Sequence, residues 1–147
     1  MFIEMELSEI QMSHMHNQQV VILTEKNGAR SIPIFIGLFE ASAMDFAINE
    51  GKAPRPLTHD LIFNVLDDFG LKIDRVLVDS LHEDTFYGKL VIADETGNEK
   101  WVDSRPSDAI VLACKRHLPI FVHEDVLNKV SDEPDQSTDS ENEPDVF

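Results

Sequence analysis

The chain has 147 residues, of which 28 are acidic and 12 basic, and its formal net charge is −16. This length indicates a single domain with a core of its own, and the single cysteine, Cys114, excludes a disulfide framework and a cysteine-ligated zinc site. The sequence contains no cluster of Lys and Arg, so its composition argues against tight non-specific binding of nucleic acid.

The N-terminal half of the sequence predicts three strands followed by two helices. Apolar residues that alternate with polar ones indicate strands, and Asn27 with Gly28 supplies the turn of a hairpin. Apolar residues at helical spacing indicate helices, the second of which has Thr58 as its expected N-cap and stops at Gly70. In chain order we expect strands over 2–12, 20–24 and 31–36, a helix over 39–47 and a helix over 58–69.

The C-terminal half repeats this order. We expect strands over 73–81, 85–93 and 99–104, a helix over 107–117, a strand over 120–122 and a helix over 124–130. In each half three strands precede a helix that opens with a carboxylate and an alanine, Glu40-Ala41 and Asp108-Ala109. The sequence therefore predicts an α+β domain with a mainly antiparallel sheet, built from a duplicated β3-α unit, with helices covering the sheet.

The two ends of the chain carry different signals. Residues 131–147 hold seven acidic and no basic residues and are rich in Ser, Pro, Asn and Gln, which predicts a disordered acidic tail after a domain over 1–130. The N-terminus alternates apolar with acidic residues and lacks the basic and apolar regions of a signal peptide. Because no apolar run approaches the roughly 20 residues of a membrane span, we expect a soluble, cytoplasmic protein without a membrane partner.

Two segments, 55–60 and 103–108, concentrate polar side chains just before predicted helices. Helix entrances can hold a phosphate, a metal or a substrate, but the same residue types also serve as ordinary caps. Capping is a sufficient account of Pro56, Thr58, Pro106 and Ser107, and Asp108 is open to an ion pair with Arg105, three residues earlier. Capping does not explain Arg55, His59, Asp103 and Arg105.

Several motifs together resemble a known family. They are Ile34-Phe35-Ile36-Gly37 with Glu40-Ala41, the segment 55–60, Thr85-Phe86-Tyr87, the segment 103–110 and Pro119-Ile120-Phe121-Val122. In this order the motifs resemble the bifunctional nuclease domain family of bacteria and plants, over about residues 1–130. The resemblance implies a compact α+β domain that self-associates as a homodimer or a higher homo-oligomer. It also implies nucleic acid as the partner, because plant members are credited with RNase and DNase activity.

A nuclease of this acidity has to approach a polyanion and activate water, and a divalent metal held by carboxylates would do both. Oxygen ligands suit Mg²⁺ or Mn²⁺. From this chemistry we expect three groups of site residues: Glu40, Asp103 and Asp108 as metal ligands, Arg55 and Arg105 as phosphate ligands, and His59, Asp60 and Asp108 in catalysis.

The alternative is a non-enzymatic, self-associating binding or regulatory module. In that case Arg105 and Asp108 form an internal ion pair that fixes the start of the last long helix. Carboxylates that converge in an open cleft would favour the enzyme, whereas carboxylates that are mutually paired would favour the structural role.

Overall fold

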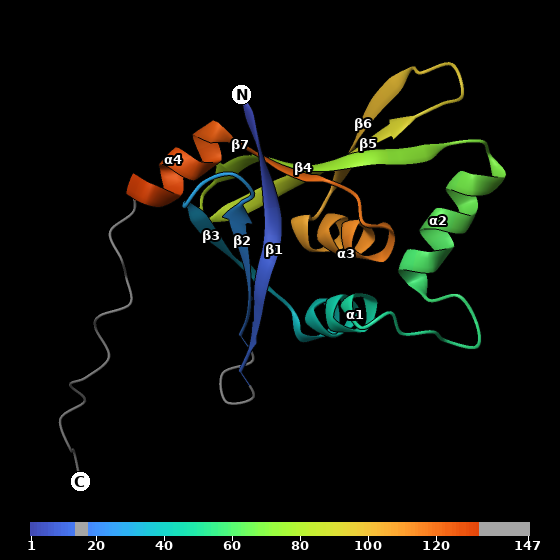
Figure 1. Ribbon diagram of the computed structural model, residues 1–147, viewed down its shortest axis with the longest axis horizontal. Helices are drawn as coiled ribbons and strands as arrows, with labels where there is room; N and C mark the ends of the chain where they lie inside the picture. The colour runs from blue at the N-terminus through green and yellow to red at the C-terminus, as the bar shows by residue number, and fades with distance from the viewer. Residues whose placement is uncertain (14–17, 133–147) are drawn as a thin grey trace, which may run out of the picture.

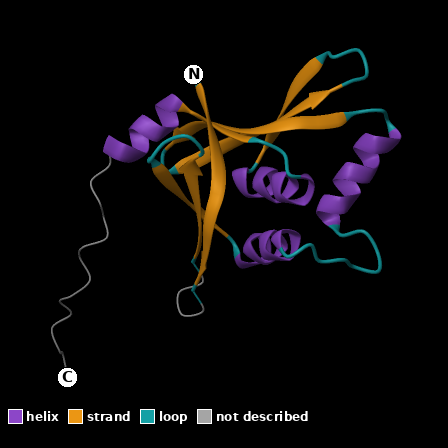
Figure 2. Ribbon diagram, in the orientation of Figure 1, coloured by secondary structure: helices purple, strands orange, loops and turns teal. Residues whose placement is uncertain are grey.

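The computed structural model describes residues 1–13 and 18–132. Over these residues the fold is α+β, with one mixed sheet of seven strands and with four helices; Figures 1 and 2 show how they are arranged. In chain order the elements are β1 Phe2–Met12, β2 Gln19–Glu25, β3 Ser31–Ile36, α1 Leu38–Ile48, α2 Thr58–Asp68, β4 Lys72–His82, β5 Thr85–Ala93, β6 Glu99–Ser104, α3 Pro106–Arg116, β7 Ile120–His123 and α4 Glu124–Asp132.

The sheet consists of two antiparallel three-stranded meanders joined by β7. Its strand order is β3-β2-β1-β7-β4-β5-β6. The strand β7 pairs antiparallel with β1, where Ile120 faces Met5, and parallel with β4, where Ile120 faces Val76. The prediction of a mainly antiparallel sheet is therefore confirmed. Each meander is followed by a helix, α1 or α3, while the duplication of one unit stays a prediction.

One expected helix boundary is wrong. Leu57, and not Thr58, is the N-cap residue of α2, and Thr58 is the first residue of the helix. The reason lies in Asp60, whose side-chain Oδ2 accepts a hydrogen bond of 2.9 Å from the backbone N–H of Leu57. A carboxylate at the third helical position satisfies that N–H, so no hydroxyl is needed at the cap.

The core lies between the sheet and the helices, and α3 is its most buried helix. Its residues Ala109–Ala113 are at most 2 % exposed, because the sheet covers one side of the helix and α1 packs alongside it (Figure 1). The apolar residues of α1 that complete this layer are Ala41, Met44 and Ala47. This packing fixes both ends of α3, and the polar residues at these ends form the sites described below.

No helix among the described residues is long and apolar enough to cross a membrane. The last described element, α4, packs against β3, β4 and β7 and ends at Asp132. Residues 133–147, which make up most of the predicted acidic tail, lie outside the described residues.

Candidate active site

A chain of polar contacts joins the N-terminal ends of α1, α2 and α3. Asp108 in the first turn of α3 uses both carboxylate oxygens: Oδ1 lies 3.0 Å from Nε2 of His59, and Oδ2 accepts a 2.8 Å hydrogen bond from Nε of Arg105. Nη1 of Arg105 donates a 3.1 Å hydrogen bond to Oε1 of Glu40. We call these four residues the helix-entrance cluster. The sequence prediction of an Arg105–Asp108 ion pair is confirmed.

Two glycines and a proline shape the backbone around this cluster. Gly37 is the N-cap residue of α1, and a Cβ there would collide with the carboxylate of Glu40. Gly88 of β5 lies against the start of α3, where a Cβ would come within 3.0 Å of the Ser104 carbonyl oxygen and 3.2 Å of the Pro106 Cα. Pro106 occupies the first helical position, where its missing N–H costs nothing.

The environment holds Asp108 in its charged form. Burial opposes ionisation of this carboxyl, but the hydrogen bonds with Arg105 and His59 outweigh burial and lower its pKa below the usual value. The hydrogen bond with Asp108, with a smaller effect from Glu40, raises the pKa of Arg105 further. The cluster therefore holds two carboxylates and one permanent cation, and its remaining charge depends on whether His59 is protonated.

The side chains of the cluster differ in how far they are exposed to solvent. The side chain of His59 is 13 % exposed and that of Asp108 is 29 % exposed, whereas that of Arg105 is 64 % exposed. Within the described residues, Nη2 of Arg105 and Nδ1 of His59 have no hydrogen-bond partner. The guanidinium can thus receive an anion, and one imidazole nitrogen remains for a proton transfer.

The carboxylates of the cluster do not form a ready metal site. Arg105 lies between Glu40 and Asp108 and takes oxygens of both. Within residues 1–13 and 18–132, no group of three or more His, Cys, Asp and Glu is arranged to hold a metal ion. A metal coordinated by Glu40 and Asp108 would first have to displace the Arg105 guanidinium.

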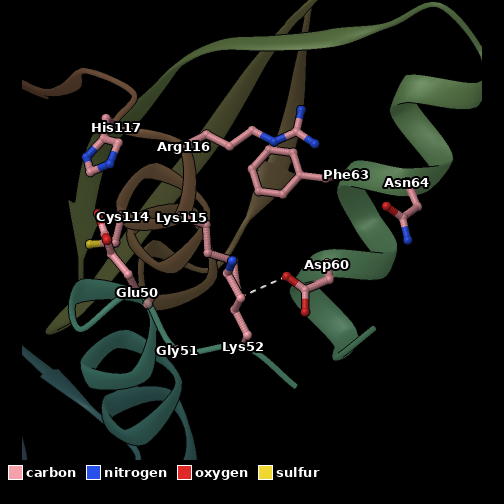
Figure 3. Close-up of a pocket in the computed structure, with 11 residues that line it drawn as sticks. Glu50, Gly51, Lys52, Asp60, Phe63, Asn64, Cys114, Lys115, Arg116 and His117 are labelled. Atoms are coloured by element: carbon pink, nitrogen blue, oxygen red, sulfur yellow. Dashed lines mark hydrogen bonds and ion pairs between the residues drawn. The ribbon is translucent and has the colours of Figure 1, made fainter. Parts of the chain in front are cut away.

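Asp60 follows His59 directly, but it belongs to a different site. Its Oδ1 accepts a 2.8 Å hydrogen bond from Nζ of Lys115, near the C-terminal end of α3 (Figure 3). This bond and the one from the Leu57 N–H outweigh burial and lower the pKa of Asp60. The pair lines a cavity of about 370 Å³ that is also lined by Lys52, Phe63, Arg116 and His117. The catalytic role expected for Asp60 stays a prediction.

The structure does not bring Arg55 or Asp103 into contact with the cluster. Asp103 on β6 is 78 % exposed and lies 3.3 Å from Nζ of Lys89, which also lies 3.4 Å from Asp79. Arg55 is exposed in the segment between α1 and α2 and makes no hydrogen bond or ion pair within the described part of the chain. Their expected roles at a metal and a phosphate stay predictions.

Sequence reasoning did not single out Lys115 and Lys89, which hold Asp60 and Asp103. Lys115 lies in the last turn of α3, where a basic residue is accounted for by the helix dipole alone. Lys89 lies on β5 opposite Asp103 of β6, so the cross-strand register would have identified this pair.

Comparison with known proteins gives one family. The model of the bifunctional nuclease domain matches residues 21–135. An uncharacterized protein of Mycobacterium tuberculosis is 37 % identical over 137 residues, which cover 90 % of this chain and 81 % of that protein. Bifunctional nuclease 1 of Oryza sativa subsp. indica and bifunctional nuclease of Oryza minuta are 25 % identical over 107 residues, or 71 % of this chain. The match spans about a third of the rice proteins, 32 % of their length.

Proposed function

The chain belongs to the bifunctional nuclease domain family, and from this premise we propose that it is a nuclease that hydrolyses phosphodiester bonds of RNA, DNA or both. The observation that supports the proposal most is the helix-entrance cluster, in which Asp108 holds an imidazole on one oxygen and a guanidinium on the other. The predicted duplication of a β3-α unit is consistent with it, because Glu40 and Asp108 begin the two corresponding helices.

His59 is the proposed proton carrier. In hydrolysis a water oxygen bonds to phosphorus while the bond from phosphorus to the leaving oxygen breaks; the water loses a proton and the leaving oxygen gains one. Imidazole can accept and give these protons near neutral pH. Asp108, 3.0 Å from Nε2, orients the ring, so Nδ1 is the nitrogen that exchanges protons with the substrate.

Arg105 is the proposed phosphate ligand. Its Nε and Nη1 are held by Asp108 and Glu40, so the guanidinium is oriented before substrate binds. The free Nη2 then donates to a non-bridging phosphate oxygen, which places the phosphorus beside the His59–Asp108 pair. Glu40 acts in this scheme as a positioning residue for Arg105.

The charge of the site requires a further cation. With His59 neutral the cluster has a net charge of −1, which repels a phosphodiester. A divalent ion, Mg²⁺ or Mn²⁺, would supply this charge and a more acidic water when bound. Because Arg105 already occupies the space between Glu40 and Asp108, we assign such an ion no fixed place among these carboxylates.

Cleavage assays with the full chain test the proposal. Single-stranded RNA, single-stranded DNA and duplex DNA are incubated with the protein in Mg²⁺, in Mn²⁺ and in EDTA. We expect cleavage of at least one substrate, and a loss of at least about 100-fold in kcat for His59→Gln and for Asp108→Asn. The control is Asp74→Asn, which removes a carboxylate from an exposed ion pair with Arg75 and should leave kcat unchanged.

The outcomes separate the parts of the proposal. A wild-type chain that leaves all three substrates intact, while a control nuclease cuts them, contradicts the nuclease function. Full activity in EDTA shows that cleavage needs no divalent ion. Full activity of His59→Gln assigns the proton transfer to another residue, for which Asp60 is the first candidate.

A second candidate function is the non-enzymatic, self-associating module, and two observations favour it. Arg105 and Asp108 form the internal ion pair expected of such a module, and the exposed face of α2 is apolar. Four apolar side chains recur there every four residues and are 44–77 % exposed: Leu57, Leu61, Val65 and Phe69. If this stripe is an interface between copies, Leu61→Glu lowers the mass measured by sedimentation, whereas Val102→Glu on β6 does not. A wild-type chain that sediments as a monomer contradicts this second function.

A further inference from the structure

The junction between β3 and α1 exposes large apolar side chains beside Arg105. Phe35 is 65 % exposed, Leu38 45 % and Phe39 85 %. In β3 the alternation of the strand buries Ile34 in the core and turns Phe35 to the solvent side. Large apolar side chains that are exposed together mark surfaces that bind another protein, a membrane or a ligand.

A cavity of about 300 Å³ lies at this junction. Its walls come from the end of β3, the start of α1, the turn before β5, the start of β5 and the start of α3. They include Phe35, Phe86 and Arg105 together with the carboxylates of Glu40 and Asp84. We call it the Phe35 cavity. Its volume is at the lower end of the range for small-molecule sites, which is enough for one aromatic ring system with its immediate substituents.

The Phe35 cavity combines two chemistries. The ring of Phe35 offers a flat apolar surface, and Arg105 offers a guanidinium whose Nη2 has no partner among the described residues. An aromatic ring next to an arginine is how proteins hold a nucleotide of a single strand, with the base on the ring and the phosphate on the cation. A base inside a duplex cannot use such a site because both of its faces are already stacked.

The charge of the chain bears on which contacts can hold a nucleic acid. A protein with a net charge of −16 gains little from the general attraction between basic surfaces and a phosphate backbone. Stacking on Phe35 does not depend on that attraction, and one contact from Arg105 needs only one phosphate. Binding through this cavity therefore depends on access to an unpaired base more than on charge.

We propose that the Phe35 cavity binds one unpaired nucleobase, stacked on Phe35 with the neighbouring phosphate on Arg105, so that the substrate class is single-stranded nucleic acid. This inference rests on the proposed nuclease function and narrows it. The stacked base sets the position of the phosphate that Arg105 carries to His59.

Binding is measured apart from cleavage. The full chain is titrated, in Mg²⁺ and again in EDTA, into a fluorescently labelled single strand and into its duplex, and the strand is checked afterwards for integrity. We expect the single strand to bind more tightly than the duplex, and Phe35→Ala to weaken single-strand binding about 5- to 150-fold, the range for loss of one stacked base. Phe35→Tyr keeps the ring and should bind within about 2-fold of wild type. Trp101→Ala removes a 50 % exposed aromatic side chain on β6, outside the cavity, and is the matched control; it should leave binding of the single strand unchanged.

Four results would overturn the inference: no binding of the single strand, equal or tighter binding of the duplex, unchanged binding by Phe35→Ala, or an equal loss in Trp101→Ala. A change of oligomeric state in Phe35→Ala with nucleic-acid binding intact would identify the surface as an interface between copies and overturn it as well. A wild-type chain that binds the single strand through Phe35 but does not cut it contradicts the proposed function and leaves the inference standing. A chain that cuts the single strand with a KM that Phe35→Ala leaves unchanged supports the proposed function and contradicts the inference.

Discussion

The carboxylate of Asp108 and that of Asp60 lie at the ends of α3 and are held in different ways. Asp108 is shared between an imidazole and an exposed guanidinium, an arrangement that can bind an anion and move a proton. Asp60 pairs with Lys115, whose side chain is only 12 % exposed, and also caps α2. The carboxylate of Asp108 is therefore suited to catalysis, whereas that of Asp60 holds α2 against α3.

The role of Asp60 predicts a pH dependence of stability. Its pKa is lowered in the folded protein from a usual value of 3.8, first by Lys115 and then by the Leu57 N–H. A lowered folded pKa means that the stabilisation is fully present above the unfolded pKa and is lost as the pH falls through the folded pKa. Asp60→Asn should cost about 1 kcal/mol of unfolding free energy at pH 7, in the range of a partly exposed ion pair and a cap.

Urea unfolding of wild type and of Asp60→Asn at several pH values checks the predicted pH dependence of stability. The difference between the two unfolding free energies should be constant from pH 7 down to about pH 5 and should shrink below pH 3.8. A difference that stays the same down to the lowest pH at which both chains are folded would show that Asp60 acts through packing and not through charge.

Among the elements, the junction of β5, β6 and α3 decides where Arg105 and Asp108 lie. The junction is tight because Gly88 lets the backbone of Ser104 and Pro106 approach β5. Backbone cannot move aside as a side chain does, so a methyl group here shifts the start of α3 and, with it, the cluster.

Gly88→Ala should therefore destabilise the protein by about 1–3 kcal/mol, the usual cost of overpacking. Gly28→Ala, whose Cβ would meet only the side chain of Glu25, is the control and should cost less. Thermal or urea unfolding gives the two values, and the cleavage assay that tests the proposed function, run on the folded Gly88→Ala chain, reports the displacement. Equal stability of the two variants would contradict the tight junction.

The sequence predicted most elements, because each has a local signal. Alternation of apolar residues located β3, β5 and β6 with the bounds that the structure has, and helical spacing located α1 and α3 to within a residue or so at either end. The predicted N-cap of α2 was wrong because Asp60, three residues after Leu57, provides the capping that was expected of Thr58.

The candidate site was predicted only in part. The helix entrances and the i to i+3 pair of Arg105 with Asp108 are local features and could be found. The contact of His59 with Asp108 spans 49 residues, and that of Arg105 with Glu40 spans 65. Such pairs depend on how α1, α2 and α3 pack, for which one sequence holds no direct signal. The contact of Lys115 with Asp60 depends on the same packing of helices.

The whole molecule is acidic even without its C-terminal segment. Residues 1–130 hold 21 acidic and 12 basic side chains, and residues 133–147 add six acidic side chains and no basic one. Charge of this sign opposes the approach of nucleic acid over a distance set by the salt concentration.

A chain that ends at residue 132 tests both the predicted domain boundary and this repulsion. Its melting temperature should equal that of the full chain, because the composition of the C-terminal segment predicts a tail that adds nothing to the core. Its affinity for a single-stranded oligonucleotide should be several-fold higher at low salt, and the difference should vanish near 1 M salt, where the Debye length is about 3 Å. A lower melting temperature would move the domain boundary beyond 132, and an unchanged affinity at low salt would contradict the repulsion.

The position of β7 between the two meanders bears on how the protein forms during synthesis. Each meander pairs strands that are neighbours in the chain, so each can form soon after it leaves the ribosome. The two halves of the sheet are joined through Ile120–His123, which are translated after both meanders and all three helices of the cluster. Until β7 is inserted, β1 and β4 each present an unpaired edge to other nascent chains. Among the described strands β7 thus closes the sheet, and the interval before β7 is inserted is the one in which β1 and β4 are most open to mispairing.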